Sequence, residues 1–232
     1  MQANSPPEFS GLLLFDKPKG ITSHDAVDLL RLKLRLKRIG HGGTLDPMAT
    51  GLLLLLVGPA TKIQASLQSS SKVYSGVIKF GSQTDTWDAE GRVTAEASLP
   101  DLREEAVKSA IAAFSGTITQ QVPPFSAVRF QGRHLYSLAR ASAAMPEIKR
   151  QAQVKWLSWA LKGAELEFVI ECSGGAYIRS VAHELGHALG VFGHLAALRR
   201  ESIGRFNVSD AITREALLAL SASAIQERLM KV

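Results

Sequence analysis

Cysteine, aromatic residues and long apolar runs are all scarce in this sequence. Of 232 residues, one is cysteine, Cys172, and 6% are aromatic. A single cysteine excludes an intramolecular disulfide framework and is typical of proteins from a reducing compartment. The longest unbroken aliphatic run, residues 52–57, is too short to cross a bilayer as a helix. No basic segment precedes the leucines at 12–14, so we expect no signal peptide. These absences predict a cytoplasmic protein without a membrane anchor.

Charge and length set the next constraints. The chain carries a formal net charge of +6, and its isoelectric point is near 9.6. A basic chain is a candidate to bind a polyanion such as a nucleic acid, although many basic proteins bind none. Hydrophobic residues make up 46% of the chain and the mean hydropathy is +0.06. These values are typical of a globular protein with one large core.

A glycine-rich stretch at residues 40–51, GHGGTLDPMATG, is the most distinctive part of the sequence. It holds four glycines and one carboxylate, Asp46, which Pro47 follows. Glycines at this density suit a backbone that takes positive φ or approaches a ligand closely, and a proline restricts the residue before it to extended conformations. Asp46 is therefore either a reactive group on a stiff loop or an ordinary turn residue whose carboxylate bonds its own backbone. The spacing of a phosphate-binding loop is missing.

Residues 40–62, GHGGTLDPMATGLLLLLVGPATK, resemble the catalytic motif of the TruB class of pseudouridine synthases. A second stretch, GAYIRS at residues 175–180 with LRR at 198–200, resembles another motif of that class. The resemblance implies a pseudouridine synthase fold and an enzyme that isomerises uridine to pseudouridine in tRNA, at uridine 55 of the T-loop. Strand and helix patterns without regular βαβ alternation also favour an α+β fold, with a mixed, mostly antiparallel sheet flanked by helices.

The resemblance also implies a set of site residues. Asp46 matches the catalytic Asp, Tyr74 matches the Tyr that stacks on the target uracil, and Arg179 matches the Arg that pairs with the catalytic Asp. Taken without the resemblance, Tyr74 could equally be a core aromatic on an alternating strand, and Arg179 a solvated helix cation. Further contacts to the substrate are implied for His41, Asp88 and Tyr177.

Cations are expected to meet the phosphates of the RNA. In residues 31–38 they alternate with leucines in a strand-like period directly after a helical pattern, so helix and strand both stay open there. Phosphate contacts would offset the cost of flipping a uridine out of its loop. The predicted RNA-binding residues are Lys17, Lys19, Arg31, Lys33, Arg35, Lys37, Arg38, Lys62, Arg199 and Arg200.

The implied reaction breaks the N-glycosidic bond of uridine and joins C5 to C1′ without redox change or an added group. We therefore expect no cofactor and no metal. The reaction needs an ionised carboxylate at Asp46, acting as nucleophile or base, and a guanidinium at Arg179 would keep it charged. We expect tRNA as the partner and a monomeric protein.

The segment HELGH at residues 183–187 is a formal match to the zinc motif H-E-x-x-H. On a helix, His183 and His187 would share a face and Glu184 could act as a base. Zinc needs a third protein ligand, but the position ten residues after the first histidine is Gly193, with His194 one residue further. A zinc hydrolase is thus one competing interpretation. A non-catalytic RNA-binding protein on the same fold is another.

Short-range patterns predict the order of elements. We expect strands at 11–16, 52–57, 73–80, 127–130, 154–161, 166–172 and 204–208. A helix is expected to begin at Ser23, because Thr22 and Asp25 form a capping pair there. Further helices are expected at 60–68, 101–114, 134–144, 177–189 and from Ile212 to the end of the chain. The expected domains are a disordered tail at 1–10, a catalytic domain at 11–210, and a short C-terminal helical tail at 211–232 in place of a full PUA domain.

Overall fold

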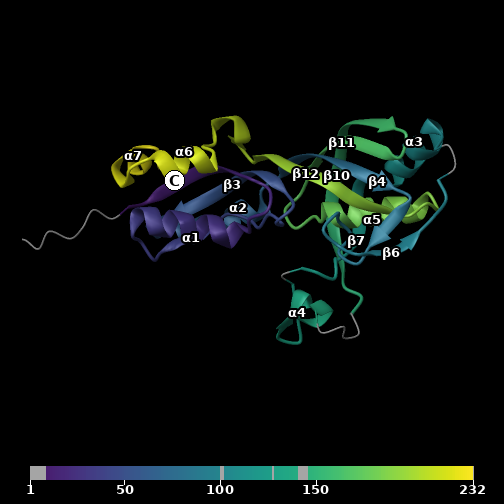
Figure 1. Ribbon diagram of the computed structural model, residues 1–232, viewed down its shortest axis with the longest axis horizontal. Helices are drawn as coiled ribbons and strands as arrows, with labels where there is room; N and C mark the ends of the chain where they lie inside the picture. The colour runs from purple at the N-terminus through teal and green to yellow at the C-terminus, as the bar shows by residue number, and fades with distance from the viewer. Residues whose placement is uncertain (1–8, 100–101, 127, 141–145, 232) are drawn as a thin grey trace, which may run out of the picture. The chain divides into compact units, whose positions relative to one another are not determined.

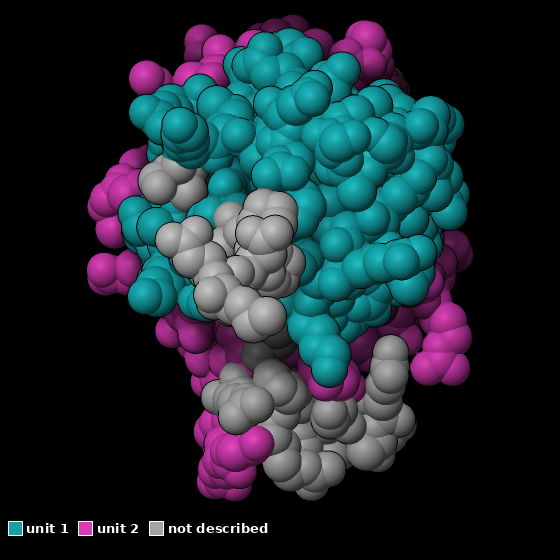
Figure 2. Space-filling model, turned by 90° about the vertical axis from the view of Figure 1, so that its left-hand side faces the viewer, with its two compact units in different colours: residues 1–72, 199–232 teal, residues 73–198 magenta. Residues whose placement is uncertain are grey.

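A computed structural model describes residues 9–99, 102–126, 128–140 and 146–231. The chain divides into two compact units, residues 1–72 with 199–232 (unit 1) and residues 73–198 (unit 2), coloured separately in Figure 2. The first eight residues of the expected tail lie outside the described residues. The expected division into 11–210 and 211–232 remains a prediction.

Unit 1 combines a leucine-rich strand pair with short helices (Figure 1). Its elements are β1 (Gly11–Lys17), α1 (Ser23–Leu34), β2 (Ile39–His41), β3 (Thr50–Val57), a 3₁₀ helix (Gly58–Ile63), α2 (Gln64–Ser69), the end of β12 (Gly193–Ile203), β13 (Phe206–Asn207), a second 3₁₀ helix (Val208–Asp210), α6 (Arg214–Ala219) and α7 (Ala222–Glu227). The strands run in the order β1-β3-β12, with β2 on β3 and β13 on β12. Helix α1 contacts β2 and β3, while α6 contacts β1.

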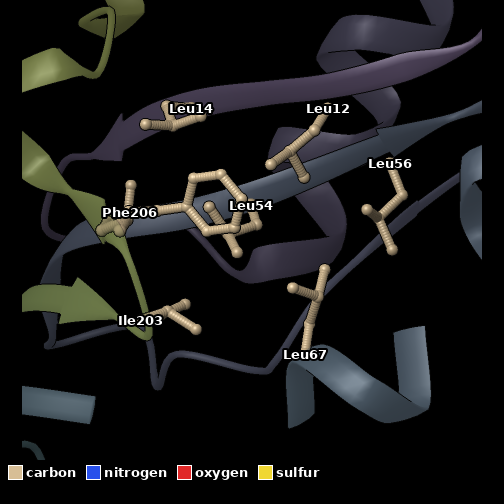
Figure 3. Packing of buried hydrophobic residues seen from close by; sticks show 8 residues of the cluster. Leu12, Leu14, Leu54, Leu56, Leu67, Ile203 and Phe206 are labelled. Atoms are coloured by element: carbon tan, nitrogen blue, oxygen red, sulfur yellow. The ribbon is translucent and has the colours of Figure 1, made fainter. Parts of the chain in front are cut away.

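The apolar residues 52–57, which follow the glycine-rich stretch, lie in the core of unit 1. β1 and β3 pair antiparallel from Gly11↔Val57 to Lys17↔Gly51, and every β3 residue from 51 to 57 is buried. Figure 3 shows leucines of β1 and β3 packed with Leu67 of α2, Ile203 and Phe206. Full burial of one such side chain contributes about 1.5–3 kcal/mol. The pair therefore forms a rigid base on which the glycine-rich loop is mounted.

Helix α1 begins where the capping pattern predicts. Thr22 accepts a hydrogen bond from the Asp25 amide, and the Asp25 carboxylate accepts one from the Thr22 amide, so both halves of the capping box are present. The helix runs to Leu34 and ends on Arg35, which takes the left-handed conformation (φ 53°). Residues 31–34 are therefore helical, and 36–38 lead irregularly into β2. The strand-like alternation of leucine and cation in residues 31–38 forms no strand. Leu30 and Leu34 are buried one helical turn apart, and this packing favours the helix.

Unit 2 is built on the longest strands of the chain. Its elements are β4 (Lys72–Phe80), β5 (Ser82–Thr84), β6 (Val93–Glu96), α3 (Glu104–Ala113), β7 (Gly116–Gln121), β8 (Arg129–Phe130), β9 (Arg133–His134), α4 (Leu135–Arg140), β10 (Lys149–Lys162), β11 (Glu165–Cys172), α5 (Ile178–Ala188) and the first part of β12. Its main strands run in the order β12-β4-β11-β10-β7, while β5 and β6 form a separate ribbon, as do β8 and β9. Helix α5 contacts α3 and β7.

The α+β fold with a mostly antiparallel sheet is confirmed, and most expected elements are present. The strands expected at 154–161 and 166–172 form the β10–β11 hairpin, which turns at Gly163 (φ +59°). The strand expected at 204–208 is present but shorter, as the two-residue β13, and the eleven-residue β12, which ends at Ile203, has no counterpart among the expected elements. Arg199 and Arg200 lie within β12, and its pairing with β3 is parallel. The sequence pattern missed this strand because the adjacent cations Arg199 and Arg200 interrupt its apolar alternation.

The C-terminal tail is helical in part, as expected, but its helices are short. Besides α6 and α7, two isolated β-bridges join the tail to β1, at Leu12↔Met230 and Phe15↔Ile212. The amides of Leu12 and Met230 each donate to the other residue's carbonyl at 2.9 Å. In the described part of the chain, no helix is both long enough and apolar enough to cross a membrane.

Candidate active site

Asp46 lies half-buried in the loop between β2 and β3, and hydrogen bonds fix the backbone on both sides of it. The buried hydroxyl of Ser23 accepts from the Leu45 amide at 2.8 Å and donates to the Leu45 carbonyl at 3.1 Å. On the other side, the Pro47 carbonyl accepts from the Gly20 amide at 2.9 Å. The loop is therefore stiff at the residues next to the carboxylate. The sequence analysis missed Ser23, whose only signal was its place at the start of a helix.

Lys17 is a second anchor of this loop, which corrects its predicted role in RNA binding. Its side chain is fully buried, and the ammonium group donates to the carbonyls of Ile21 at 2.8 Å, Pro18 at 3.0 Å and Pro47 at 3.3 Å. A buried cation that binds three carbonyls is not presented to a phosphate. Lys17 lies next to the Asp46 loop, but the sequence pattern could not show that its side chain points inward.

Arg200 is also placed differently from the prediction. It is 1% exposed, and its guanidinium donates to the carbonyls of Leu52 at 2.7 Å, Gly43 at 3.1 Å and Thr44 at 3.3 Å. A role in phosphate binding does not fit this burial. Among the described residues, no carboxylate lies within ion-pair distance of Arg200, so the cation interacts with peptide dipoles. The structure assigns this arginine to the base of the Asp46 loop.

His41 lies at the start of the same loop and is half-buried. Burial lowers the pKa of His41, and the charges of Arg200 and His24 lower it further. Within the described chain its Nδ1 has no hydrogen-bond partner. The ring is therefore neutral near pH 7 and retains an unused polar atom.

In unit 2, Arg179 and Asp88 form a buried ion pair. Arg179 is 5% exposed, and its Nη1 lies 3.7 Å from Oδ2 of Asp88. The guanidinium also donates to the carbonyls of Thr86 at 3.0 Å and Phe125 at 2.9 Å. The Asp88 carboxylate accepts from the Thr86 hydroxyl at 2.6 Å and from the Glu90 amide at 3.0 Å. The structure thus brings these two predicted residues together, while the pairing of Arg179 with Asp46 stays a prediction.

Hydrogen bonds to β7 hold the start of helix α5, where Tyr177 and Arg179 lie. The carboxamide of Gln120, 1% exposed, accepts from the Tyr177 amide at 3.1 Å and donates to the Tyr177 carbonyl at 3.0 Å. One turn further, the Ser180 hydroxyl donates to the Gln121 carbonyl at 2.6 Å. The sequence analysis missed Gln120 and Ser180, because nothing in the local sequence indicates which polar residues bond to distant backbone.

Tyr74 lies on β4 and is buried, which fits both the stacking role and the core-aromatic alternative. Its position on an inward-facing site of the strand follows the alternation that predicted β4. The assignment of Tyr74 to the substrate stays a prediction.

The HELGH residues lie on α5 as expected, but they are engaged in other contacts. His183 stacks on Trp87 with ring centroids 4.2 Å apart, and burial lowers its pKa to about 4. His187 Nε2 lies 2.8 Å from Oε1 of Gln83. The Glu184 carboxylate accepts from the Gln121 amide at 2.8 Å, and burial raises its pKa. The described residues contain no group of three His, Cys, Asp or Glu side chains that could hold a metal ion. The zinc interpretation therefore lacks a third ligand among them.

The remaining predicted RNA contacts fall into two sets. Three cations are engaged within unit 1: Arg31 donates to Asp28 and to the Ile39 carbonyl, Lys33 donates to the carbonyls of Leu218 and Leu220, and Arg199 makes two hydrogen bonds, of 3.0 and 2.8 Å, to the Asp16 carboxylate. The exposed set comprises Lys19, Arg35, Lys37, Arg38 and Lys62. Arg38 also donates to the Thr61 hydroxyl at 3.2 Å, which places it beside the 3₁₀ helix that carries Lys62.

Two family models match consecutive parts of the chain. Residues 31–178 match the family model of the TruB family pseudouridylate synthase N-terminal domain. Residues 179–232 match that of the tRNA pseudouridylate synthase B C-terminal domain. The chain is 43% identical over 228 residues to a tRNA pseudouridine synthase B of Opitutus terrae, covering 97% of this chain and 94% of the relative. It is 44% identical over 224 residues to the protein of that name from Microcystis aeruginosa, covering 94% and 76%.

A solved structure shares the fold. A chain in the crystal structure of a Cbf5-Nop10-Gar1 complex superposes with a TM-score of 0.67 at 28% identity. The superposition covers 90% of this chain and 53% of that one, so the present chain spans about half its length.

The class of protein follows from these matches and from the loop and helix described above: the chain is an enzyme with the pseudouridine synthase fold. Within that class, it belongs to the TruB family of pseudouridylate synthases.

Proposed function

We propose that this enzyme isomerises uridine 55 in the T-loop of tRNA, with Asp46 as the catalytic carboxylate. The observation that carries the proposal is the fixation of the backbone on both sides of Asp46, by Ser23 at Leu45 and by Lys17 at Pro47. A reacting group needs such fixation, because small displacements from the productive geometry cost much of the rate. The names of the relatives, tRNA pseudouridine synthase B, support tRNA as the substrate.

The reaction conserves atoms and electrons. The bond from N1 of uracil to C1′ of ribose breaks, the base turns, and C5 bonds to C1′. The proton on C5 is lost to solvent and N1 gains one, so substrate and product are isomers. Asp46 acts as nucleophile or as base and must be ionised at the start. The reaction needs no electron donor. The other side chains of the site have to hold the base, the ribose and the Asp46 carboxylate in place.

A uridine inside a folded RNA loop has to be flipped out before Asp46 can reach it, at a cost of a few kcal/mol. We assign the stacking contact with the flipped base to Tyr74, a contact worth about 1–3 kcal/mol. Arg179 would pair with Asp46 in the bound complex, and its rigid hold by Asp88 and two carbonyls suits that task. His41, Asp88 and Tyr177 complete the proposed substrate contacts.

The exposed cations supply the proposed contacts to RNA phosphates. Lys37, Arg38 and Lys62 are all exposed in unit 1. The hydrogen bond from Arg38 to Thr61 links the two segments that carry them. Arg35 ends helix α1 beside them, and Lys19 lies in the turn after β1. Recognition would rest on the shape of the T-loop and on its unstacked bases, with phosphate contacts fixing the register.

The test is to incubate the protein with an unmodified T-loop stem-loop RNA and with full-length tRNA, in the presence of a chelator, and to map pseudouridine. We expect modification of both RNAs at the uridine corresponding to position 55. A matched RNA with that uridine replaced by cytidine should remain unmodified. Modification at another position would refute the T-loop assignment, and no modification of either RNA would refute the proposed substrate.

A further inference from the structure

A buried arginine at the base of the Asp46 loop has no role in the chemistry described so far. Arg200 donates from Nη2 to Gly43, from Nη1 to Thr44 and from Nε to Leu52, so one planar group joins the two ends of the loop. Two of these acceptors lie two and three residues before Asp46. Guanidinium has five donors in a fixed plane, whereas a lysine ammonium is a point charge on a flexible stem. A lysine at position 200 would not reproduce the planar arrangement in which Arg200 holds its three carbonyls.

The backbone of β12 fixes where this side chain emerges. Arg200 pairs with Gly51 in parallel register, and Gly51 has φ +98°. A Cβ at position 51 would lie 2.3 Å from the Arg200 carbonyl oxygen and 2.7 Å from its amide nitrogen. Glycine at this position therefore permits the close approach of the two strands that brings the guanidinium to the loop.

Ser23 holds the next residue of the same loop. Its hydroxyl binds both the amide and the carbonyl of Leu45, the residue directly before Asp46. Gly43, Thr44 and Leu45 are thus bound in succession by two side chains, one from β12 and one from the start of α1. The segment that leads into the proposed catalytic residue has almost no backbone freedom.

We propose that Arg200, together with Ser23, is a positioning residue that sets the orientation of the Asp46 carboxylate by holding the carbonyls of residues 43–45. The inference rests on the proposed catalytic role of Asp46. It makes Arg200 part of the reaction without contact to RNA or substrate. Its removal should therefore slow the chemical step and leave binding of tRNA intact.

The experiment compares Arg200→Lys and Ser23→Ala with wild type at a temperature well below unfolding, measuring kcat, KM and the Kd for tRNA. We expect kcat to fall about 100-fold in Arg200→Lys, because a displacement near 1 Å costs about that factor. KM and Kd should stay within about threefold of wild type. Ser23→Ala should show the same split, and it serves as the independent variant if Arg200→Lys does not fold.

A control separates positioning from general stability. Leu217→Ala removes a fully buried side chain of α6 in the same unit, away from the loop. This variant should lose thermal stability but keep kcat at the assay temperature. If Arg200→Lys and Ser23→Ala behave as Leu217→Ala does, the side chains are merely structural and the inference is overturned. A raised Kd and a salt slope reduced by about one, with kcat unchanged, would instead make Arg200 a phosphate contact.

Asp46→Asn, assayed in parallel, distinguishes failure of the proposed function from failure of the inference about Arg200. Turnover by Asp46→Asn would overturn the proposed function, and the inference with it. If Asp46→Asn is inactive while Arg200→Lys and Ser23→Ala retain full kcat, the inference alone fails.

Discussion

Two buried arginines in this enzyme are held in different ways. Arg179 in unit 2 has a carboxylate partner, Asp88, and two carbonyl acceptors. Arg200 in unit 1 binds three carbonyls and, within the described residues, no carboxylate lies at ion-pair distance from it. The acid and the two carbonyls hold the Arg179 guanidinium in one orientation, which suits a residue that meets substrate. Three backbone carbonyls hold the Arg200 guanidinium, which suits a residue that shapes a loop.

The largest expected effect separates these two arrangements by their response to removal of an acid. Arg179→Met leaves the buried Asp88 carboxylate without its cation, whereas Arg200→Met leaves only neutral carbonyls. Both should lower the free energy of unfolding at pH 7 by about 3–5 kcal/mol. Adding Asp88→Asn to Arg179→Met should recover part of that loss, because no uncompensated buried charge remains. Adding Asp88→Asn to Arg200→Met should bring no recovery. Urea unfolding measures all four variants, and equal losses in Arg179→Met and in its double variant would break the comparison.

The next effect concerns the hold on helix α5. Gln120→Leu removes the reciprocal pair with the Tyr177 backbone and takes the acceptor from the Tyr177 amide, while the Tyr177 carbonyl keeps its bonds from the Ser180 and Val181 amides. The expected loss is about 1–3 kcal/mol of unfolding free energy. Gln153→Leu is the matched control, because Gln153 is exposed on β10 and bonds Thr117 at the surface. Its substitution should change stability by no more than about 0.5 kcal/mol. Equal losses in the two variants would show that the Gln120 pair contributes nothing specific.

Gly51→Ala tests the close approach of β12 to the loop in unit 1. The new methyl group would meet the Arg200 backbone at 2.3 Å and would also sit at φ +98°. Strain of this kind costs about 1–3 kcal/mol. Gly163→Ala provides the control, since Gly163 also has positive φ (+59°) but has no atom within 4 Å of a built Cβ. Thermal unfolding should show a clearly larger drop in Tm for Gly51→Ala. A larger drop for Gly163→Ala would refute the close-packing argument.

The titration of His183 in unit 2 has the smallest expected effect at neutral pH. Burial beside Trp87, with a smaller contribution from the charge of His187, lowers its pKa from 6.5 to about 4. Between these values the unfolded state binds a proton that the folded state does not, so the stability contributed by the neutral ring is lost as the pH falls from about 6.5 to about 4. NMR titration should place the His183 transition near pH 4. His183→Phe should keep the stack on Trp87 and flatten the stability curve over this range. A transition near 6.5 would contradict the burial of the ring.

The sequence predicted local features of both units better than contacts between distant residues. It located the Asp46 loop, the capping box of α1 and the β10–β11 hairpin, because glycines, caps and alternation are local signals. It did not reveal that Lys17 and Arg200 point inward, since a cation in a motif looks the same whether it meets phosphate or a carbonyl. It also missed Ser23 and Gln120, whose partners lie 22 and 57 residues away in the chain. Strand β12 escaped detection for the same reason, because long-range pairing decides its conformation.

The central claim is that Asp46 reacts and does not merely shape the loop. Release of tritium from tRNA labelled at C5 of uridine, under single-turnover conditions, measures the chemistry directly, and the Kd for tRNA is determined on the same preparations. For Asp46→Asn we predict no detectable release and a Kd within about threefold of wild type, because the amide keeps the shape of the carboxylate but neither its charge nor its nucleophilicity. Tritium release by Asp46→Asn at a rate near that of wild type would contradict the claim. Loss of tRNA binding together with turnover would instead make Asp46 a structural residue.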